Sequence, residues 1–173
     1  MIIGIDLSLC NTGIVLLDDD NVMLEHSIIS KPQGKRPIDE LERLMSIVNQ
    51  VEHVIRKHEI KLAVVEGIAF GISRTTSLSQ LSGLNYMVRH MLHREEVDFL
   101  IVPPTTLKKF ITGKGNSPKD VMLLETYKRY KKAYTDNNLC DGFGLAKIGE
   151  VFLDPDKGVK FQKDVVKVLK KQI

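Results

Sequence analysis

Three acidic residues are placed where they could act together. Asp6 and Glu66 each end an apolar run, "IIGID" and "KLAVVE", and Asp141 shares a helical face with Leu145 and Ile148. A charge inside a buried strand is costly unless it is paired or bound to a metal ion. We therefore expect Asp6 and Glu66 at the ends of adjacent central strands, with Asp141 directed at the same edge of the sheet.

A site built from such acids would suit a hard metal ion. Carboxylates without histidine favour Mg²⁺ or Mn²⁺ over zinc. Two such ions, about 4 Å apart, can activate a water molecule and stabilise the leaving oxygen in phosphodiester hydrolysis. Each acid taken alone is more often a surface residue or a helix cap, and Asp141 could simply complement a helix dipole. The hypothesis therefore depends on all three acids meeting in one place.

The elements that must position these acids alternate between strands and helices. Apolar runs and turn signals predict strands at 1–8, 13–19, 22–30, 61–67 and 98–102. Helical spacing predicts helices at 38–58, 76–94, 105–111, 139–153 and after 159, and a capping box at Ser117, Pro118 and Asp120 starts another that ends near 134. This order indicates an α/β fold, a mixed five-stranded sheet with antiparallel opening strands and helices on both faces, as in the ribonuclease H-like architecture.

The composition is typical of a globular domain. The 173 residues carry 25 Lys and Arg against 22 Asp and Glu, a net charge of +3. No apolar run approaches the roughly 20 residues of a membrane span, and the start of the chain lacks the pattern of a secretory signal. We expect a single domain over 1–173 that resides in the cytoplasm, with Cys10 and Cys140 as reduced thiols of no assigned role.

Basic residues are concentrated in the second half of the chain. Residues 108–132 contain eight Lys and Arg against two acids, and a lysine-rich tail from about 154 has six lysines after Asp156 against Asp164 alone. Such a local positive field would attract a polyanion such as nucleic acid. Ordinary solvated helix faces explain these lysines about equally well.

The sequence resembles the RuvC-type Holliday junction resolvases. Four stretches carry the resemblance in the family's order: "IIGIDLSLCNTG", "LAVVEGIAF", "LKKFITGKGNSPKDVM" and "NNLCDGFGLA". The resemblance extends through about Leu153 and implies a metal-dependent endonuclease that cuts four-way DNA junctions, and other branched DNA. It also implies two Mg²⁺ per active site, with Mn²⁺ as a substitute, and a homodimer.

The resemblance further implies roles for individual residues. Asp6, Glu66 and Asp141 would be the catalytic metal ligands, and Lys119 would stabilise charge on the phosphate. The implied DNA contacts are Phe70, Lys108, Lys109 and Lys119, and we also expect contacts from Arg74, in the Phe70 loop, and from Lys114, whose flanking glycines allow close approach to a phosphate. Phe70 would be either a wedge in an opened junction or an anchor beneath its loop. The helix at 78–93, where Gly83 allows close approach, would form the dimer interface or simply pack in the core.

One position departs from the family. A further acid usually stands three residues before the last one, where this chain has Asn138. The Asn138 amide oxygen would share a helical face with Asp141 and could ligate a second ion as a neutral donor, which would bind that ion more weakly. Asp136 is the alternative ligand, although its offset of five from Asp141 directs it elsewhere on a helix.

Other functions remain open from the sequence alone. A related ribonuclease H-like nuclease could act on RNA precursors, and a non-catalytic DNA-binding module could retain the fold. A small-molecule kinase of the actin-like superfold is disfavoured, because 173 residues are too few for its two lobes. The host is expected to be a bacterial cell, with a bacteriophage origin as an alternative.

Overall fold

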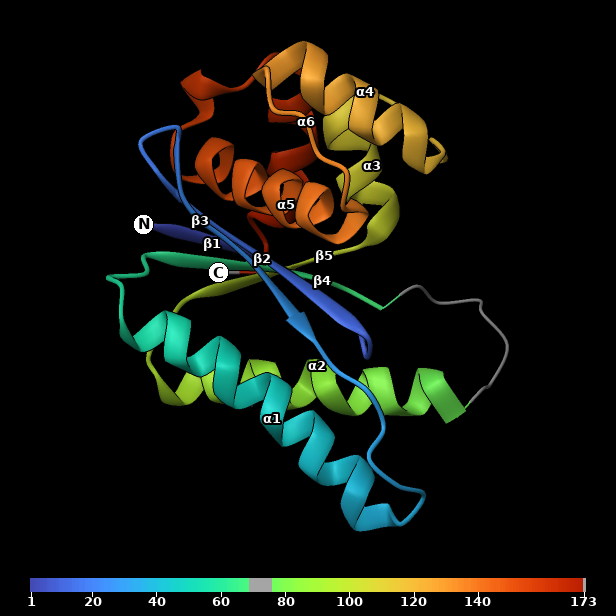
Figure 1. Cartoon of the computed structure of the whole chain (residues 1–173). Coiled ribbons are helices and arrows are strands. Elements are labelled where there is room, and N and C mark those ends of the chain that lie inside the picture. The colour runs from blue at the N-terminus through green and yellow to red at the C-terminus, as the bar shows by residue number, and fades with distance from the viewer. Residues whose placement is uncertain (69–75, 173) are drawn as a thin grey trace.

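The computed structural model describes residues 1–68 and 76–172, and arranges them around one mixed five-stranded sheet (Figure 1). The strands are β1 (Ile2–Asp6), β2 (Asn11–Asp18), β3 (Asn21–Ile29), β4 (Leu62–Glu66) and β5 (Phe99–Val102). Their order across the sheet is β3-β2-β1-β4-β5. The first three strands pair antiparallel, whereas β1–β4 and β4–β5 are parallel. The predicted fold class is thereby confirmed.

Helices cover both faces of the sheet (Figure 1). One layer holds α1 (Pro37–Arg56) and α2 (Thr76–Arg94). The other holds α3 (Pro104–Thr112), α4 (Lys119–Tyr130), α5 (Asn137–Leu153), the short 3₁₀ helix η1 (Pro155–Lys157) and α6 (Lys160–Leu169). Alternate residues of the central strands face opposite layers, so Ile3 and Ile5 pack toward α1 and α2 while Val64 packs toward α5. None of the helices in these described ranges is long and apolar enough to cross a membrane.

Helix α5 lies directly on the backbone of β1 and β2. A Cβ atom at Gly4 would overlap the carbonyl oxygen of Gly142, and one at Gly13 would overlap the carbonyl of Asn138. Glycine is required at these two strand positions because no side chain fits between helix and sheet. This contact fixes the first turn of α5 next to the end of β1.

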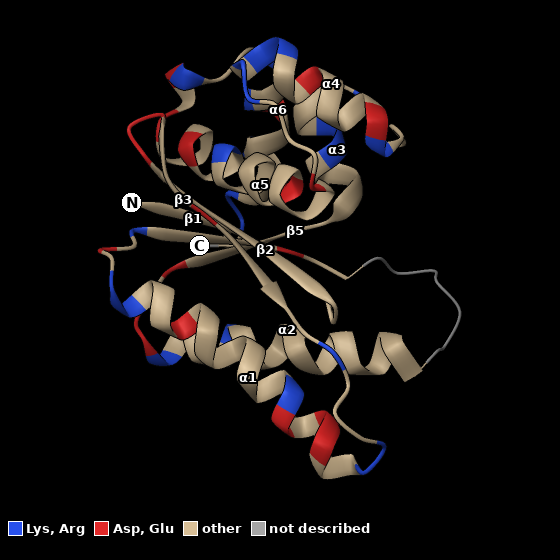
Figure 2. Cartoon of the chain, in the orientation of Figure 1, with Lys and Arg blue, Asp and Glu red and all other residues tan. Residues whose placement is uncertain are grey.

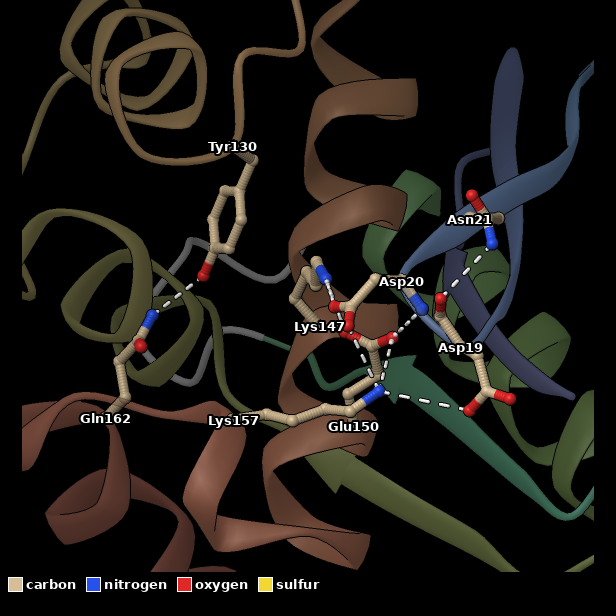
Figure 3. Close-up of polar contacts among 8 residues, drawn as sticks. All are labelled: Asp19, Asp20, Asn21, Tyr130, Lys147, Glu150, Lys157 and Gln162. Atoms are coloured by element: carbon tan, nitrogen blue, oxygen red, sulfur yellow. Dashed lines mark hydrogen bonds and ion pairs between the residues drawn. The ribbon is translucent and has the colours of Figure 1, made fainter.

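The far end of α5 is tied to the β2–β3 hairpin by buried charges (Figure 3). The side chains of Lys147 and Glu150 are only 8% and 4% exposed and form an ion pair with each other. Lys147 also binds Asp20 at 2.6 Å, and the backbone N–H of Asp20 donates to Glu150 at 2.9 Å. Asp19 and Asp20 have left-handed φ angles of 44° and 68°, so these contacts hold a strained turn in place.

Two predicted helix boundaries are wrong for identifiable reasons. The helix expected to extend to 134 ends at Tyr130, because Lys131 adopts a left-handed conformation with φ 58°. The predicted capping box is absent: Pro118 is the N-cap without a side-chain hydrogen bond. The Ser117 hydroxyl instead donates to the carbonyl of Lys114 at 3.0 Å and lies 2.7 Å from the Thr112 hydroxyl.

The expected C-terminal helix is an integral part of the core. Val165, Val166 and Leu169 of α6 are buried against α3 and α5. Helix α2 has the predicted bounds, and its face containing Leu84 and Val88 packs in the core. Gly83 has space for a Cβ atom 3.7 Å from Leu44 of α1, so it does not serve a close approach within this chain.

Candidate active site

The structure brings the three predicted acids to one end of the sheet. Ile5 of β1 pairs with Val65 of the parallel strand β4, so the next residues, Asp6 and Glu66, leave the two strands side by side. Asp6 is 6% exposed, and its carboxyl group hydrogen-bonds with that of Glu66. Asp141 lies in the second turn of α5, which the contact at Gly13 holds against the same strand end.

Burial and mutual repulsion make these carboxyl groups reluctant to ionise. Burial raises the pKa of Asp6 strongly, and the nearby charges of Glu66 and Asp141 raise it further. Burial also raises the pKa of Glu66, against the hydrogen bond from Asp6, which lowers it. The pKa of Asp141 rises to about 7, first through burial and then through the charge of Glu66. Full ionisation of the three acids would therefore place more negative charge in the site than its surroundings balance.

Two lysines partly offset this charge. Lys108 on α3 and Lys119 at the start of α4 both lower the pKa values of Glu66 and Asp141, which places their ammonium groups close to the acids. Lys109 and Lys114 are exposed on α3 and in the loop that follows it. The remaining predicted DNA contacts, Phe70 and Arg74, lie outside the described residues.

Comparison with known proteins identifies the family. The family model for the crossover junction endodeoxyribonuclease RuvC matches residues 2–144. The chain belongs to the RuvC family. A RuvC from Prochlorococcus marinus strain MIT 9313 is 33% identical over 126 residues, which cover 70% of this chain and 78% of that protein. A RuvC from Rickettsia africae is 30% identical over 125 residues, with coverages of 71% and 78%.

Solved structures show the same fold. Thermus thermophilus RuvC in complex with a Holliday junction substrate has a TM-score of 0.73 at 15% identity, covering 91% of this chain and 96% of that one. The yeast mitochondrial Holliday junction resolvase Ydc2 has a TM-score of 0.57 at 13% identity, covering 99% of this chain and 84% of that one. The likeness extends over nearly the whole chain.

The RuvC family consists of divalent-metal-dependent nucleases. The donor atoms here fit such an ion, because Asp6, Glu66 and Asp141 offer only carboxylate oxygens and repel one another when ionised. Over residues 1–68 and 76–172, no three or more Asp, Glu, His or Cys side chains are arranged as they stand so that they could hold a metal ion, and the three acids would have to move closer to bind one. Cation binding would therefore replace the hydrogen bond between Asp6 and Glu66.

The two residues considered as further ligands already have structural partners. Asp136 is the N-cap of α5: its carboxylate accepts from the backbone N–H of Asn138 at 2.8 Å and from the Asn11 side chain at 2.9 Å. Partial burial opposes ionisation of Asp136, but these hydrogen bonds bring its pKa below the usual value. The Nδ2 group of Asn138 donates to the Asn11 carbonyl. Asp136 is thus a helix cap, and α5 starts at Asn137, two residues earlier than predicted.

Asn85 supports the site and was missed in the sequence. It is 2% exposed on α2, and its Nδ2 donates to the backbone carbonyl of Glu66 at 3.0 Å. Its Oδ1 is buried and has no hydrogen-bond partner in the part of the chain that the structure describes. The sequence offered one signal for Asn85: it is a polar amide next to Leu84, on the apolar face of a helix. Asn85 fixes the strand end from which the Glu66 side chain leaves.

Replacing Asn85 by Leu is expected to reduce DNA cleavage by roughly 10- to 100-fold, because second-layer partners of metal ligands have effects of that size. The loss should decrease as the metal concentration is raised, while affinity for DNA stays unchanged. Metal titration of the cleavage rate, with thermal unfolding measured in parallel, checks this. A variant that unfolds at a lower temperature but keeps the wild-type metal dependence would show that Asn85 only packs the core.

Proposed function

We propose that this protein is an endonuclease that resolves four-way DNA junctions, using two Mg²⁺ ions held by Asp6, Glu66 and Asp141. The main support for this proposal is that three carboxyl groups from β1, β4 and α5 meet at one end of the sheet, beside Lys108 and Lys119. Relatives named crossover junction endodeoxyribonuclease support the choice of DNA. The solved structure of Thermus RuvC with a Holliday junction supports the choice of a junction.

The residues of this chain would divide the work as follows. When bound, divalent cations supply an activated water and neutralise charge on the scissile phosphate. Asp6, Glu66 and Asp141 hold and orient the site, and Asn85 keeps Glu66 in register. Lys119, whose ammonium group lies near Asp141, would stabilise charge on the phosphate, and Lys108 would add positive potential from α3. Hydrolysis would leave a 5′-phosphate and a 3′-hydroxyl.

Two symmetric cuts across a junction would need two active sites, which a homodimer provides. The outer face of α1 and α2 suits such an interface: Ile38, Leu41, Met45 and Tyr86 are 45–66% exposed there. Met45 and Tyr86 flank a groove of about 380 Å³ between the two helices. Exposed apolar side chains on these two helices favour a second copy of the chain as their partner.

The test compares substrates side by side. The wild-type protein should cut an immobile four-way DNA junction in Mg²⁺ or Mn²⁺, cut forks and linear duplex more slowly, and leave structured RNA intact. Paired nicks on opposite strands would support the dimer. Preferential cutting of RNA would favour the alternative nuclease, and junction binding without cleavage in any divalent metal would favour a non-catalytic DNA-binding module. Either result would overturn the proposal.

A further inference from the structure

A row of lysines occupies one face of α6. Lys160, Lys163, Lys167 and Lys170 are spaced by three, four and three residues, which places them on a common side of a helix. All four line a shallow groove of about 400 Å³ between α6 and the segment at Pro155. This helix lies beyond residues 2–144, which the RuvC family model matches. The lysines therefore need an explanation of their own.

The charge of this segment is only partly balanced, and Lys157 pairs with Asp20 of the β2–β3 hairpin at 3.2 Å. Residues 155–172 contain six lysines and two aspartates, which gives a net charge of +4. Lys163 pairs with Asp156 at 3.2 Å and Lys167 with Asp164 at 3.8 Å, but both acids are well exposed, at 97% and 58%. Exposed pairs of this kind contribute little and leave the lysines free to change partner.

The helix that presents the lysines is rigidly held. The buried side chain of Gln162 donates to the Phe110 carbonyl at 3.2 Å and to the Tyr130 hydroxyl at 2.8 Å. Beyond the helix, the Gln172 side chain exchanges two hydrogen bonds with the backbone of Ile101, at 2.9 and 3.0 Å, as a neighbouring strand would. The lysine face is therefore a preformed surface on a fixed element.

The row also points toward the candidate active site. The row begins at Lys160, two residues after Gly158, and Gly158 lies against Val151 near the C-terminal end of α5. That end of α5 is the one distant from Asp141. The last end of the row lies beside Ile101, and the next residue, Val102, pairs with Glu66. From Lys160 to Lys170 the helix advances about 15 Å. Figure 2 shows further Lys and Arg segments on the helices of this layer.

We propose that the α6 lysine face binds the phosphate backbone of a duplex DNA arm, at a distance from the point of cleavage. A row of lysines about 15 Å long matches successive phosphates and needs no base contact. A membrane surface fits less well, because a membrane-bound helix buries its apolar face in lipid, whereas Val165, Val166 and Leu169 are already buried in the core. The proposal rests on DNA being the substrate, as argued above.

The experiment measures binding to four-way junctions by fluorescence anisotropy in EDTA. One long-armed junction is used, with arms of about two helical turns, or about 20 bp. The variants are Lys160→Gln with Lys170→Gln, and the quadruple change that adds Lys163→Gln and Lys167→Gln. The matched control is Lys57→Gln with Lys61→Gln, which removes two exposed charges near the opposite end of β4.

On the long-armed junction, the quadruple variant should bind roughly 10-fold more weakly, and the dependence of log affinity on log salt should lose about one unit per phosphate contact removed. The double variant should lose roughly threefold, and the control should change less than twofold. An unchanged long-arm affinity or salt slope would overturn the proposal, as would an equal loss in the control. So would binding of polyglutamate or anionic vesicles that depends on these lysines while DNA binding does not.

Cleavage at saturating DNA separates this proposal from the proposed function. It should be the same for the wild type and the quadruple variant, because α6 carries none of the catalytic carboxylates. If the wild type cuts no junction, the proposed function fails, yet the binding comparison still decides the role of α6. If the wild type cuts junctions but the long-arm affinity of the variant is unchanged, only the role of α6 fails.

Discussion

Replacing Asp6 by Asn is expected to lower junction cleavage by on the order of 10³-fold or more, while junction binding is retained. The change keeps the size of a side chain that is only 6% exposed but removes one of three carboxylates that would hold the cations. Glu66→Gln and Asp141→Asn should have similar effects. Removal of like charge from the site should leave affinity for the DNA polyanion equal or higher. Single-turnover cleavage and anisotropy with the same junction measure the two properties.

Asp136 supplies the control for this prediction. It lies five residues before Asp141 in the sequence but caps α5 through the backbone N–H groups of Asn138 and Leu139. Asparagine caps helices about as well as aspartate, so Asp136→Asn should keep cleavage within a few-fold of the wild type. Cleavage that survives Asp6→Asn but not Asp136→Asn would show that the acids have been assigned to the wrong roles.

In the absence of metal, thermal stability is expected to fall as the pH rises from about 5 to 8, and Asp6→Asn should remove much of this fall. The folded state raises the pKa of Asp6 and Glu66, and that of Asp141 to about 7. Between the unfolded and folded pKa values the folded state binds more protons, so a higher pH favours unfolding. At pH 8 the variant should be more stable by roughly 1–3 kcal/mol, the usual cost of an uncompensated buried polar or charged group.

Scanning fluorimetry across pH, with and without Mg²⁺ or Mn²⁺, checks this prediction. A gain of that size corresponds to an increase of roughly 2–12 °C in melting temperature. Added metal should stabilise the wild type more than Asp6→Asn, because the cation neutralises the repulsion that the variant lacks. Below pH 4 stability should fall for another reason: Asp20, whose pKa its hydrogen bond with Lys147 lowers to about 2, would lose its ionised form. An Asp6→Asn protein no more stable than the wild type at pH 8 would contradict the charge argument.

Local pattern was sufficient to predict the sheet and the sheet end at which the three acids lie. Asp6 and Glu66 were identifiable because a charge that ends an apolar run must lie where a buried strand ends, and parallel pairing of β1 with β4 makes those ends neighbours. Asp141 was identifiable because Leu145 and Ile148 follow it at helical spacing, and the structure confirms that both are completely buried against the sheet. The spacing of apolar residues along the chain was enough for these predictions, and no contact between distant residues had to be known.

What the sequence did not reveal depends on partners far away in the chain. Ser117 looks like a helix cap, but its hydroxyl is engaged with Thr112 and Lys114. The role of Asn85 depends on the Glu66 carbonyl, 19 residues away, and Lys147 finds Asp20 across 127 residues. Neither partnership has a spacing that could be recognised beforehand. The only sign of either contact in the sequence was a polar side chain on an otherwise apolar helix.

The glycine contacts between α5 and the sheet constrain how this enzyme can evolve. Because Gly4 and Gly13 touch the α5 backbone directly, a side chain at either position would force α5, and Asp141 with it, to move relative to Asp6, so substitutions in this seam should be selected against. Drift in substrate choice should therefore accumulate elsewhere, on surfaces such as α6. Related proteins would then differ mainly in the surfaces that bind DNA, while the positions of the three acids stay the same.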